Sequence, residues 1–190
     1  MLELVTPDLD HLPQYKAALS KGWSPHSERQ SEVAKEQLAE IAVDTTTFVG
    51  LLTDIEAKGA PVILPDGSTV PRLPGYHKWI WDGDFCGSMG VRWKPGTHDL
   101  PPTCLGHIGY SIVPWKRRRG YATRALGLLL KEIRIPDLCY VEITTDPDNI
   151  ASQKVILANG GVLVERFRKT PAHGGTEALR YRIELPADRA

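Results

Sequence analysis

The chain has 190 residues, which suits one globular domain, and its 42% hydrophobic and 24% charged residues are enough for a packed core. No apolar run approaches the roughly 20 residues of a membrane helix, and the N-terminus lacks the basic and apolar segments of a signal peptide. The three cysteines are odd in number and widely spaced, which argues against a disulfide framework or a cysteine-based zinc site. We therefore expect a cytoplasmic protein with no membrane partner and no metal.

The formal net charge is zero, but the charge is unevenly distributed along the chain. Residues 1–100 hold nine basic and 14 acidic residues, whereas residues 101–190 hold 14 basic and nine acidic residues. A neutral chain is a poor candidate for non-specific nucleic-acid binding, which depends on many phosphate contacts. An acidic half beside a basic half fits a polyanionic cofactor that meets a cationic substrate, although an uneven surface alone explains it equally well.

The first 60 residues have a helical pattern. Apolar spacing predicts one helix before Gly22, a second from Ser31, and a third that Asp44 caps and that continues to Gly59. Turn residues at 65–68 then predict a hairpin or an irregular loop.

The rest of the chain alternates strand and helix signals. Strands are expected at 76–81 and 85–93, joined by hairpin-type turn residues, and at 106–113. The clearest helix is 122–134, whose apolar residues recur on one face. The elements expected after it are a strand at 138–145, a helix at 150–158 and strands at 162–167 and 179–185. The pattern predicts a single mixed α/β domain with a largely antiparallel sheet.

One segment carries a chemical signal. Strand 106–113 leads into the basic turn 116–120, and an amphipathic helix follows at once. Successive backbone N–H groups at such a turn, with the positive end of the helix dipole, form an anion site. Gly120 lets the backbone approach a ligand, and Ala122 keeps the first helical turn free of bulk. Because the glycines of a P-loop or a Rossmann turn are missing, we expect pyrophosphate binding without a metal, or else a solvated turn that caps a core helix.

The same segment resembles a known family. Arg117-x-x-Gly120-x-Ala122 fits the Arg/Gln-x-x-Gly-x-Gly/Ala signature of the GNAT superfamily of acyl-CoA-dependent N-acyltransferases. Residues 148–152, followed by 159–161, resemble the family's later segment beside the pantetheine arm. The sequence at 107–111, followed by 118–123, resembles that of small bacterial acetyltransferases. The resemblance covers residues 76–185, which would form the acetyl-CoA-binding core of one N-acetyltransferase domain spanning 1–190. Residues 1–75 would supply N-terminal helices and acceptor-side loops.

This resemblance implies a central, mostly antiparallel sheet with splayed strands, flanked by helices. Strand 106–113 would part from strand 138–145, and the pantetheine would lie between them like an added strand. The residues expected to hold acetyl-CoA are Ile112, Val113, Arg117, Arg118, Arg119, Gly120, Tyr121, Ala122, Thr123, Asn149, Ser152 and Lys154. Asn149 is equally well explained as the N-cap of the following helix.

In the family, an amine attacks the thioester directly while a base removes a proton. His107 is the first candidate base and Glu142 the second, although either could be an ordinary strand residue. The family's usual acid is a tyrosine seven residues after the asparagine, and Ile156 stands at that position here. Either the hydroxyl of Ser152 takes this role or the thiolate leaves unaided.

The family builds its acceptor site from the N-terminal helices and the loops after them. Carboxylates beside aromatic residues in this region favour a cationic, partly apolar or sugar-like amine. The resemblance to small acetyltransferases that modify aminoglycoside-like antibiotics suggests an acceptor of the kasugamycin kind, and polyamines, amino acids and protein amino termini stay open. Solvated charges and core tryptophans are the simpler explanation. The candidates are Trp23, Glu28, Glu32, Asp82, Asp84, Trp93 and Asp99.

Two other functions compete with acetyl transfer. A non-catalytic acyl-CoA-binding or sensor module is favoured by the missing tyrosine at position 156. A nucleic-acid or anion-binding protein would use the basic residues 116–119. Dimers are common in the family, and an exposed edge strand at 179–185 would support a homodimer.

Overall fold

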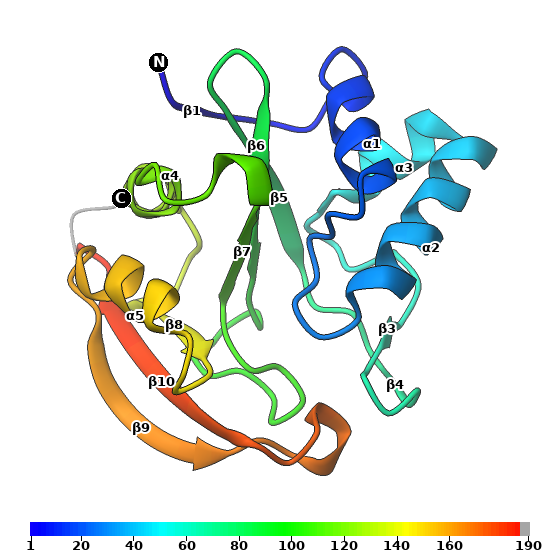
Figure 1. Cartoon of the computed structure of the whole chain (residues 1–190). Coiled ribbons are helices and arrows are strands. Elements are labelled where there is room, and N and C mark those ends of the chain that lie inside the picture. Colours follow the sequence, from blue (N-terminus) through cyan, green and yellow to red (C-terminus); the bar gives the residue numbers. More distant parts are fainter. Residues whose placement is uncertain (187–190) are drawn as a thin grey trace.

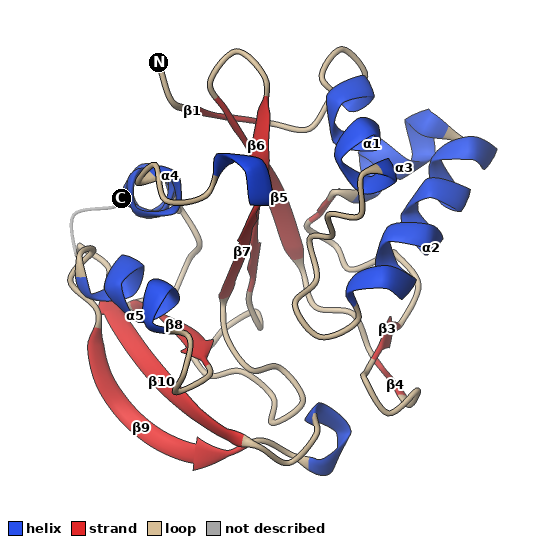
Figure 2. Cartoon of the chain, viewed as in Figure 1, coloured by secondary structure: helices blue, strands red, loops and turns tan. Residues whose placement is uncertain are grey.

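Within residues 1–186, which the computed structural model describes, two antiparallel sheets are flanked by helices (Figures 1 and 2). The first sheet has the order β1-β5-β6-β7, with β2 paired to β5, and the second has the order β8-β10-β9. The strands of the first sheet are β1 (Glu3–Val5), β2 (Thr53–Asp54), β5 (Gly75–Trp81), β6 (Phe85–Arg92) and β7 (Ile108–Ile112). Those of the second are β8 (Tyr140–Thr145), β9 (Val162–Arg168) and β10 (Glu177–Glu184).

The helices lie on both sides of the first sheet. The N-terminal helices are α1 (Leu12–Ser20), α2 (Gln30–Val43) and α3 (Thr45–Leu51), and the later ones are α4 (Tyr121–Glu132) and α5 (Ile150–Leu157). A small hairpin of β3 (Val62–Ile63) and β4 (Thr69–Val70) surrounds the predicted turn. The predicted α/β class, with antiparallel sheets flanked by helices, is confirmed.

Two hydrophobic clusters divide the core between the faces of the first sheet. Alternation along β6 sends Met89 and Val91 to the face covered by α4, together with residues of the second sheet and α5. Trp79 and Phe85 face the other way and pack against α1, α2 and α3. Residues of β6 and β7 that share the face of Trp79 and Phe85 therefore point toward the N-terminal half of the chain.

Three local predictions were wrong. The strand β1 was not foreseen, because its three residues are held by pairing with Trp79–Trp81 rather than by a local pattern. The third helix ends at Leu51 instead of Gly59, since Thr53 and Asp54 pair with β5 as β2. The strand β10 is no edge strand, because it lies between β8 and β9. Dimerisation and a cytoplasmic location stay predictions.

The two sheets meet at one end of β7. The His107 N–H donates to the Glu142 carbonyl at 2.8 Å, and the Thr144 hydroxyl donates to the Leu105 carbonyl. Figure 1 shows β8 meeting the lower part of β7. In the described part of the chain, β7 pairs with β6 and β8 with β10, so β7 and β8 form no common ladder. No helix of residues 1–186 is long and apolar enough to cross a bilayer.

Candidate active site

The strand β7 pairs along one side only, so its other edge offers free backbone groups. The Val113 N–H donates to the Cys86 carbonyl, and the Arg92 N–H donates to the His107 carbonyl. Because backbone groups alternate in direction along an antiparallel strand, the N–H and C=O of Tyr110 and Ile112 point away from β6. Apart from the Ile112 carbonyl, which accepts from Arg117 Nε, they form the free edge at which a further extended chain can bind.

This pattern corrects one prediction. Val113 was expected to bind an extended ligand through its backbone, but its N–H is bonded to β6 and its carbonyl accepts the Lys116 N–H. Its side chain is fully buried in the N-terminal core cluster. Tyr110, two residues before Ile112, takes the corresponding place on the free edge.

After β7, the chain makes a tight basic turn before α4. Arg118 and Gly120 both adopt left-handed backbone conformations, with φ of 61° and 73°. Gly120 is the N-cap of α4 and leaves the first N–H groups of the helix without a side-chain cap. Arg117, Arg118 and Arg119 are exposed, and the Arg117 Nε donates to the Ile112 carbonyl at 3.1 Å. The turn therefore combines unused N–H groups, a helix dipole and three cations, which suits a pyrophosphate.

A largely buried ion pair between Lys116 and Asp82 holds this turn against the β5–β6 turn. The Lys116 Nζ lies 2.7 Å from Asp82 Oδ1, and the Tyr121 hydroxyl donates to Asp82 Oδ2 at 2.6 Å. Burial opposes both charges, but these hydrogen bonds hold the pKa of Asp82 well below its usual range and raise that of Lys116. The Asp82–Lys116–Tyr121 brace connects the β5–β6 turn to both ends of the basic turn. Because the Asp82 carboxylate neutralises the Lys116 ammonium, Lys116 does not contribute positive charge to a ligand at the turn.

Polar groups also gather where α5 begins. Asn149 caps α5, its Oδ1 accepting the Ser152 N–H at 3.1 Å, so its side-chain NH₂ group stays available. The Tyr110 and Ser152 hydroxyls are 2.8 Å apart, which links the free strand β7 to α5. Burial raises the pKa of Tyr110 to about 12, so this hydroxyl keeps its proton at neutral pH. Ile156, one turn after Ser152, is fully buried in the core.

The sequence profile of the acetyltransferase (GNAT) domain matches residues 68–162, half of the chain. The chain belongs to the GNAT family of acetyltransferases. The matched range contains β5, β6, β7, the basic turn, α4, β8 and α5. No curated protein sequence matches the chain.

Solved GNAT structures share the fold along nearly the whole chain. RimL, a ribosomal L7/L12 alpha-N-protein acetyltransferase solved with coenzyme A, is 16% identical, with a TM-score of 0.61 over 98% of this chain and 96% of its own. An acetyltransferase from Salmonella typhimurium that modifies the N-terminal serine of L7/L12 is 17% identical, with a TM-score of 0.62 over 97% and 95%. MccE, a microcin C7 self-immunity acetyltransferase solved with acetyl-CoA and AMP, is 13% identical, with a TM-score of 0.59 over 97% and 92%.

Among the residues expected to bind the GNAT cosubstrate, several have other partners. Tyr121 holds Asp82 through its hydroxyl, and the Thr123 carbonyl accepts from Asn159 Nδ2 at 3.1 Å. Ala122 is half-buried in the first turn of α4, and Lys154 is exposed on α5. Their backbone N–H groups or charges are compatible with the expected roles.

His107 is poorly suited to act as the GNAT base. Its side chain is fully buried, and its Nδ1 accepts the Glu142 backbone N–H at 3.0 Å, which puts the ring proton on Nε2. Burial lowers its pKa to about 4, against the opposing charge of Glu142. Nε2 has no hydrogen-bond partner within the described residues. The lone pair that would accept a proton is already used, so the structure favours the simpler reading of His107 as a strand residue.

Glu142, the second candidate, is engaged as well. Its carboxylate lies 2.8 Å from Arg182 Nη2 and 3.5 Å from Arg180 Nε, and its side chain is only 13% exposed. Two guanidinium groups therefore occupy the carboxylate oxygens that a base would need to offer to an amine. Neither base candidate is free in this structure.

The acceptor candidates separate into two groups. Trp23 is buried in the N-terminal core cluster, with its Nε1 bonded to Ser111 Oγ at 3.0 Å. Asp82 and Asp84 lie beside Lys116 at the basic turn. The structure disfavours two of these acceptor candidates, because Trp23 is only 2% exposed and Asp82 is paired with Lys116. Asp84, whose side chain is 58% exposed, stays a prediction.

The other candidates remain on the surface. Trp93 is half-buried against Tyr76, and Glu32 is exposed on α2 beside Ser31. Asp99 accepts from the Tyr140 hydroxyl at 3.2 Å.

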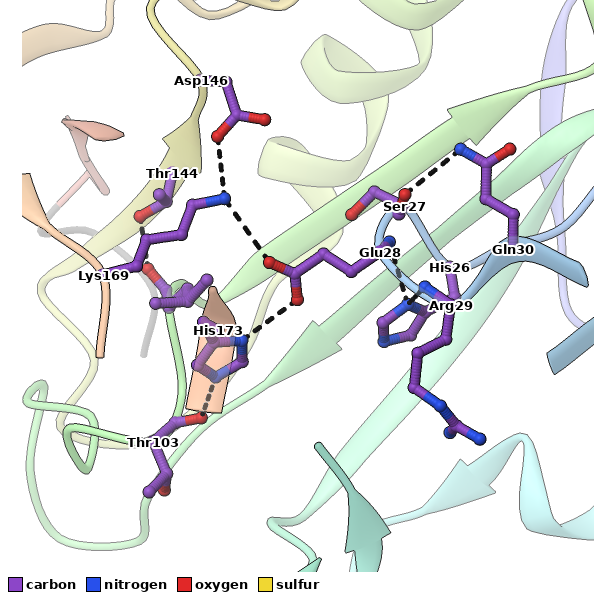
Figure 3. Close-up of polar contacts among 11 residues, drawn as sticks. His26, Ser27, Glu28, Arg29, Gln30, Thr103, Thr144, Asp146, Lys169 and His173 are labelled. Carbon is purple, nitrogen blue, oxygen red and sulfur yellow. Dashed lines mark hydrogen bonds and ion pairs between the residues drawn. The ribbon is translucent and has the colours of Figure 1, made fainter. Parts of the chain in front are cut away.

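Glu28 lies at the centre of a polar cluster that joins distant segments (Figure 3). Its carboxylate is 3.4 Å from Lys169 Nζ and 3.0 Å from His173 Nδ1. Lys169 Nζ is also 2.8 Å from Asp146, and His173 Nε2 is 3.1 Å from the Thr103 carbonyl. The Glu28 carboxylate therefore connects the α1–α2 loop to the β9–β10 turn, and it is not free to receive an amine.

Sequence reasoning missed Tyr110 and the Asp82–Lys116–Tyr121 brace. Tyr110 lies in the segment 107–111, whose sequence resembles that of GNAT enzymes, so alternation along the strand could have placed it opposite α5. The pairing of Lys116 with Asp82 had no sequence signal. In residues 1–186, no group of three or more His, Cys, Asp or Glu side chains could hold a metal ion.

Proposed function

We propose that the protein transfers the acetyl group of acetyl-CoA to a primary amine of a small molecule. The observation that carries this proposal is the free edge of β7, which leads directly into a turn with left-handed Arg118 and Gly120 and an uncapped helix. An extended chain along the strand and a pyrophosphate at the turn would together account for this geometry.

In this proposal, the pantetheine lies along β7 and bonds to the backbone groups of Tyr110 and Ile112. The pyrophosphate accepts from N–H groups of residues 118–123, and Arg117, Arg118 and Arg119 supply positive charge. The Asn149 side-chain NH₂ group donates to the pantetheine, and Lys154 lies beside it. Residues 1–190 act as one N-acetyltransferase domain.

The reaction needs little from the protein besides positioning. The amine nitrogen attacks the thioester carbonyl, a C–N bond forms, the C–S bond breaks, and the extra amine proton passes to water. The Tyr110 hydroxyl, with a pKa of about 12, keeps its proton and donates a hydrogen bond to the departing thiolate. Since thiols ionise near pH 8.5, the thiolate leaves without full protonation. Ser152 orients the Tyr110 hydroxyl.

The acceptor we propose is a small amine rather than a polycation. An aminoglycoside-like antibiotic would bring several ammonium groups, and binding them takes free carboxylates. Glu28 is already paired with Lys169 and His173, and Asp82 with Lys116. The structure therefore gives the aminoglycoside interpretation less support than the sequence did.

The proposed activity is tested by amine-dependent release of CoA from acetyl-CoA, measured with a thiol reagent over a panel of small amines. Saturable release that requires both substrates supports acetyl transfer. Tight acetyl-CoA binding without release from any amine would instead identify the non-catalytic acyl-CoA-binding module, which the buried Ile156 favours. A protein that binds no acetyl-CoA would contradict both functions.

Tyr110→Phe is expected to lower kcat by about 10- to 100-fold, because one hydrogen bond to a charged group contributes about 1.5–3 kcal/mol. The dissociation constant for acetyl-CoA should change less than twofold, since the backbone of β7 is unaltered. Steady-state kinetics and calorimetric titration measure the two quantities.

Tyr181→Phe is the matched control, because the Tyr181 hydroxyl also donates to α5, at Gln153 Oε1, 3.2 Å away, but from β10. This variant should keep wild-type kcat. Equal losses in both variants would show that a tie to α5 matters, and would remove the special role of Tyr110.

A further inference from the structure

The face of the first sheet opposite α4 holds an unusual pair of glycines. On β6, Gly90 and Arg92 alternate with the core residues Met89 and Val91, so they share the face of the N-terminal helices. A Cβ on Gly90 would come within 3.0 Å of His77 Nε2, and a Cβ on Gly109 of β7 within 2.9 Å of Arg92 Nη2. The missing side chains leave room beside the strands for the His77 imidazole and for the guanidinium of Arg92, an exposed residue.

Two carboxylates whose charges act on the histidines near Arg92 are already paired with cations. Glu28 pairs with Lys169 and His173, and Glu142 with Arg180 and Arg182. Asp99 accepts from the Tyr140 hydroxyl. Glu28 and Glu142 therefore have cationic partners of their own, whereas Asp99 is exposed and has no ion pair within residues 1–186.

Arg92 differs from these groups. Within residues 1–186, its guanidinium has neither an ion pair nor a hydrogen bond, although its side chain is held against Gly109. Burial is the largest cause that lowers the pKa of His26, His77 and His107. The positive charge of Arg92 lowers the pKa of each of them further. The imidazoles are therefore neutral at pH 7, whereas Arg92 carries a charge that no residue of 1–186 pairs.

We propose that Arg92 binds an anionic group of the acceptor, which is then a small amine that also carries a carboxylate or a phosphate. A guanidinium offers a planar pair of donors that matches either anion. Gly109 adjoins Tyr110, so the anion would bind beside the strand along which acetyl-CoA is proposed to lie. This inference rests on the proposed function, and it reverses the cationic acceptor that composition suggested.

The test compares amines that differ only in the anion. Glycine and aspartate are each compared with their amides, and 2-aminoethyl phosphate with ethanolamine, by CoA release from acetyl-CoA. We expect kcat/KM to be at least tenfold higher for the anionic member of one or more pairs. The carboxylate and phosphate pairs distinguish the two sources of the anion. Arg92→Gln should reduce that ratio to near one, and Gly109→Ala should reduce it in the same direction by displacing the guanidinium.

The controls separate this inference from the proposed function. Arg166→Gln removes an exposed arginine on β9 that pairs with Glu177, and it should keep the wild-type preference. Acetyl-CoA affinity should be unchanged in Arg92→Gln. If CoA release favours neutral or polycationic amines, or if Arg92→Gln keeps the preference, the inference fails while acetyl transfer stands. If no amine releases CoA, acetyl transfer fails. The inference is then decided by calorimetric titration of the same pairs into the CoA-bound protein, where Arg92-dependent binding of the anionic members supports it and its absence refutes it.

Discussion

Gly120→Asp is expected to abolish the stabilisation of the fold by acetyl-CoA. In the wild-type protein, ligand at about 100 times its dissociation constant should add about 2.7 kcal/mol of stability, a rise in Tm of roughly 5–10 °C for a chain of this length. The substitution places a carboxylate at the N-cap of α4, where it would take the N–H groups meant for the pyrophosphate and repel it. The Tm of the variant should therefore not respond to acetyl-CoA.

The fold itself should tolerate this change. Gly120 has φ of 73°, and a Cβ there would meet nothing within 4 Å. The left-handed conformation costs an aspartate about 1–2 kcal/mol, and an acidic residue at the start of a helix recovers about 0.3–1 kcal/mol. Differential scanning fluorimetry without ligand should show a Tm within a few degrees of the wild type.

Gly67→Asp is the matched control. Gly67 also has a positive φ, 85°, with open space at its Cβ, but it lies in the β3–β4 hairpin, which pairs with neither of the two larger sheets. This variant should respond fully to acetyl-CoA. Arg118→Glu tests the same site through charge alone and should weaken the response. A Gly120→Asp protein that melts like the wild type and still responds fully would mean that acetyl-CoA binds elsewhere.

The elements of the cosubstrate half followed from local sequence patterns. The apolar periodicity of α4 and the turn residues between β5 and β6 are interactions between near neighbours, so the chain order alone exposes them. The basic turn was found in the same way, because the strand end, the glycine and the helix start are contiguous. The α4 bounds, Tyr121–Glu132, differ from the predicted 122–134 by one or two residues at each end.

The partners of the charged side chains did not follow from the sequence. Asp82 pairs with Lys116, 34 residues away, and Glu28 with His173, 145 residues away. Each of these acids is an ordinary surface charge when the chain is taken alone, and only the three-dimensional arrangement neutralises it. For the same reason, the sequence indicated an acidic acceptor region, whereas in the folded chain Glu28 and Asp82 are paired and the guanidinium of Arg92 has no ion pair within residues 1–186.

Replacing His107 is the second change expected to have a large effect. We expect it to lower the free energy of unfolding rather than the rate of acetyl transfer. His107→Ala removes the acceptor for the buried Glu142 N–H and leaves a cavity between the two sheets. An unsatisfied buried donor costs about 1–3 kcal/mol, and the cavity adds to this, so we expect a loss of about 2–4 kcal/mol. Chemical denaturation at pH 7.5 measures it.

His107→Asn separates structure from titration. The asparagine carbonyl can occupy the position of Nδ1 and accept the same N–H, so most of the stability should return. It cannot take up a proton, however. If His107 were the catalytic base, this variant would lose activity at neutral pH while melting like the wild type. We expect instead that kcat/KM and its pH profile stay close to those of the wild-type protein.

The pH dependence of stability gives the sharpest test of this assignment. In the unfolded chain, histidine protonates near pH 6.5, whereas in the folded protein burial lowers the pKa of His107 to about 4. Between these values the unfolded state binds the extra proton, so the wild-type protein should lose stability as the pH falls from 6.5 to 4, by up to about 1.4 kcal/mol per pH unit from this residue. His77, with a pKa also lowered to about 4 by burial, should add a similar loss. His26, whose pKa burial also lowers, adds to this loss. His107→Asn should remove the His107 contribution alone, and an unchanged acid slope would mean that His107 is accessible to protons in the folded state, as a base must be.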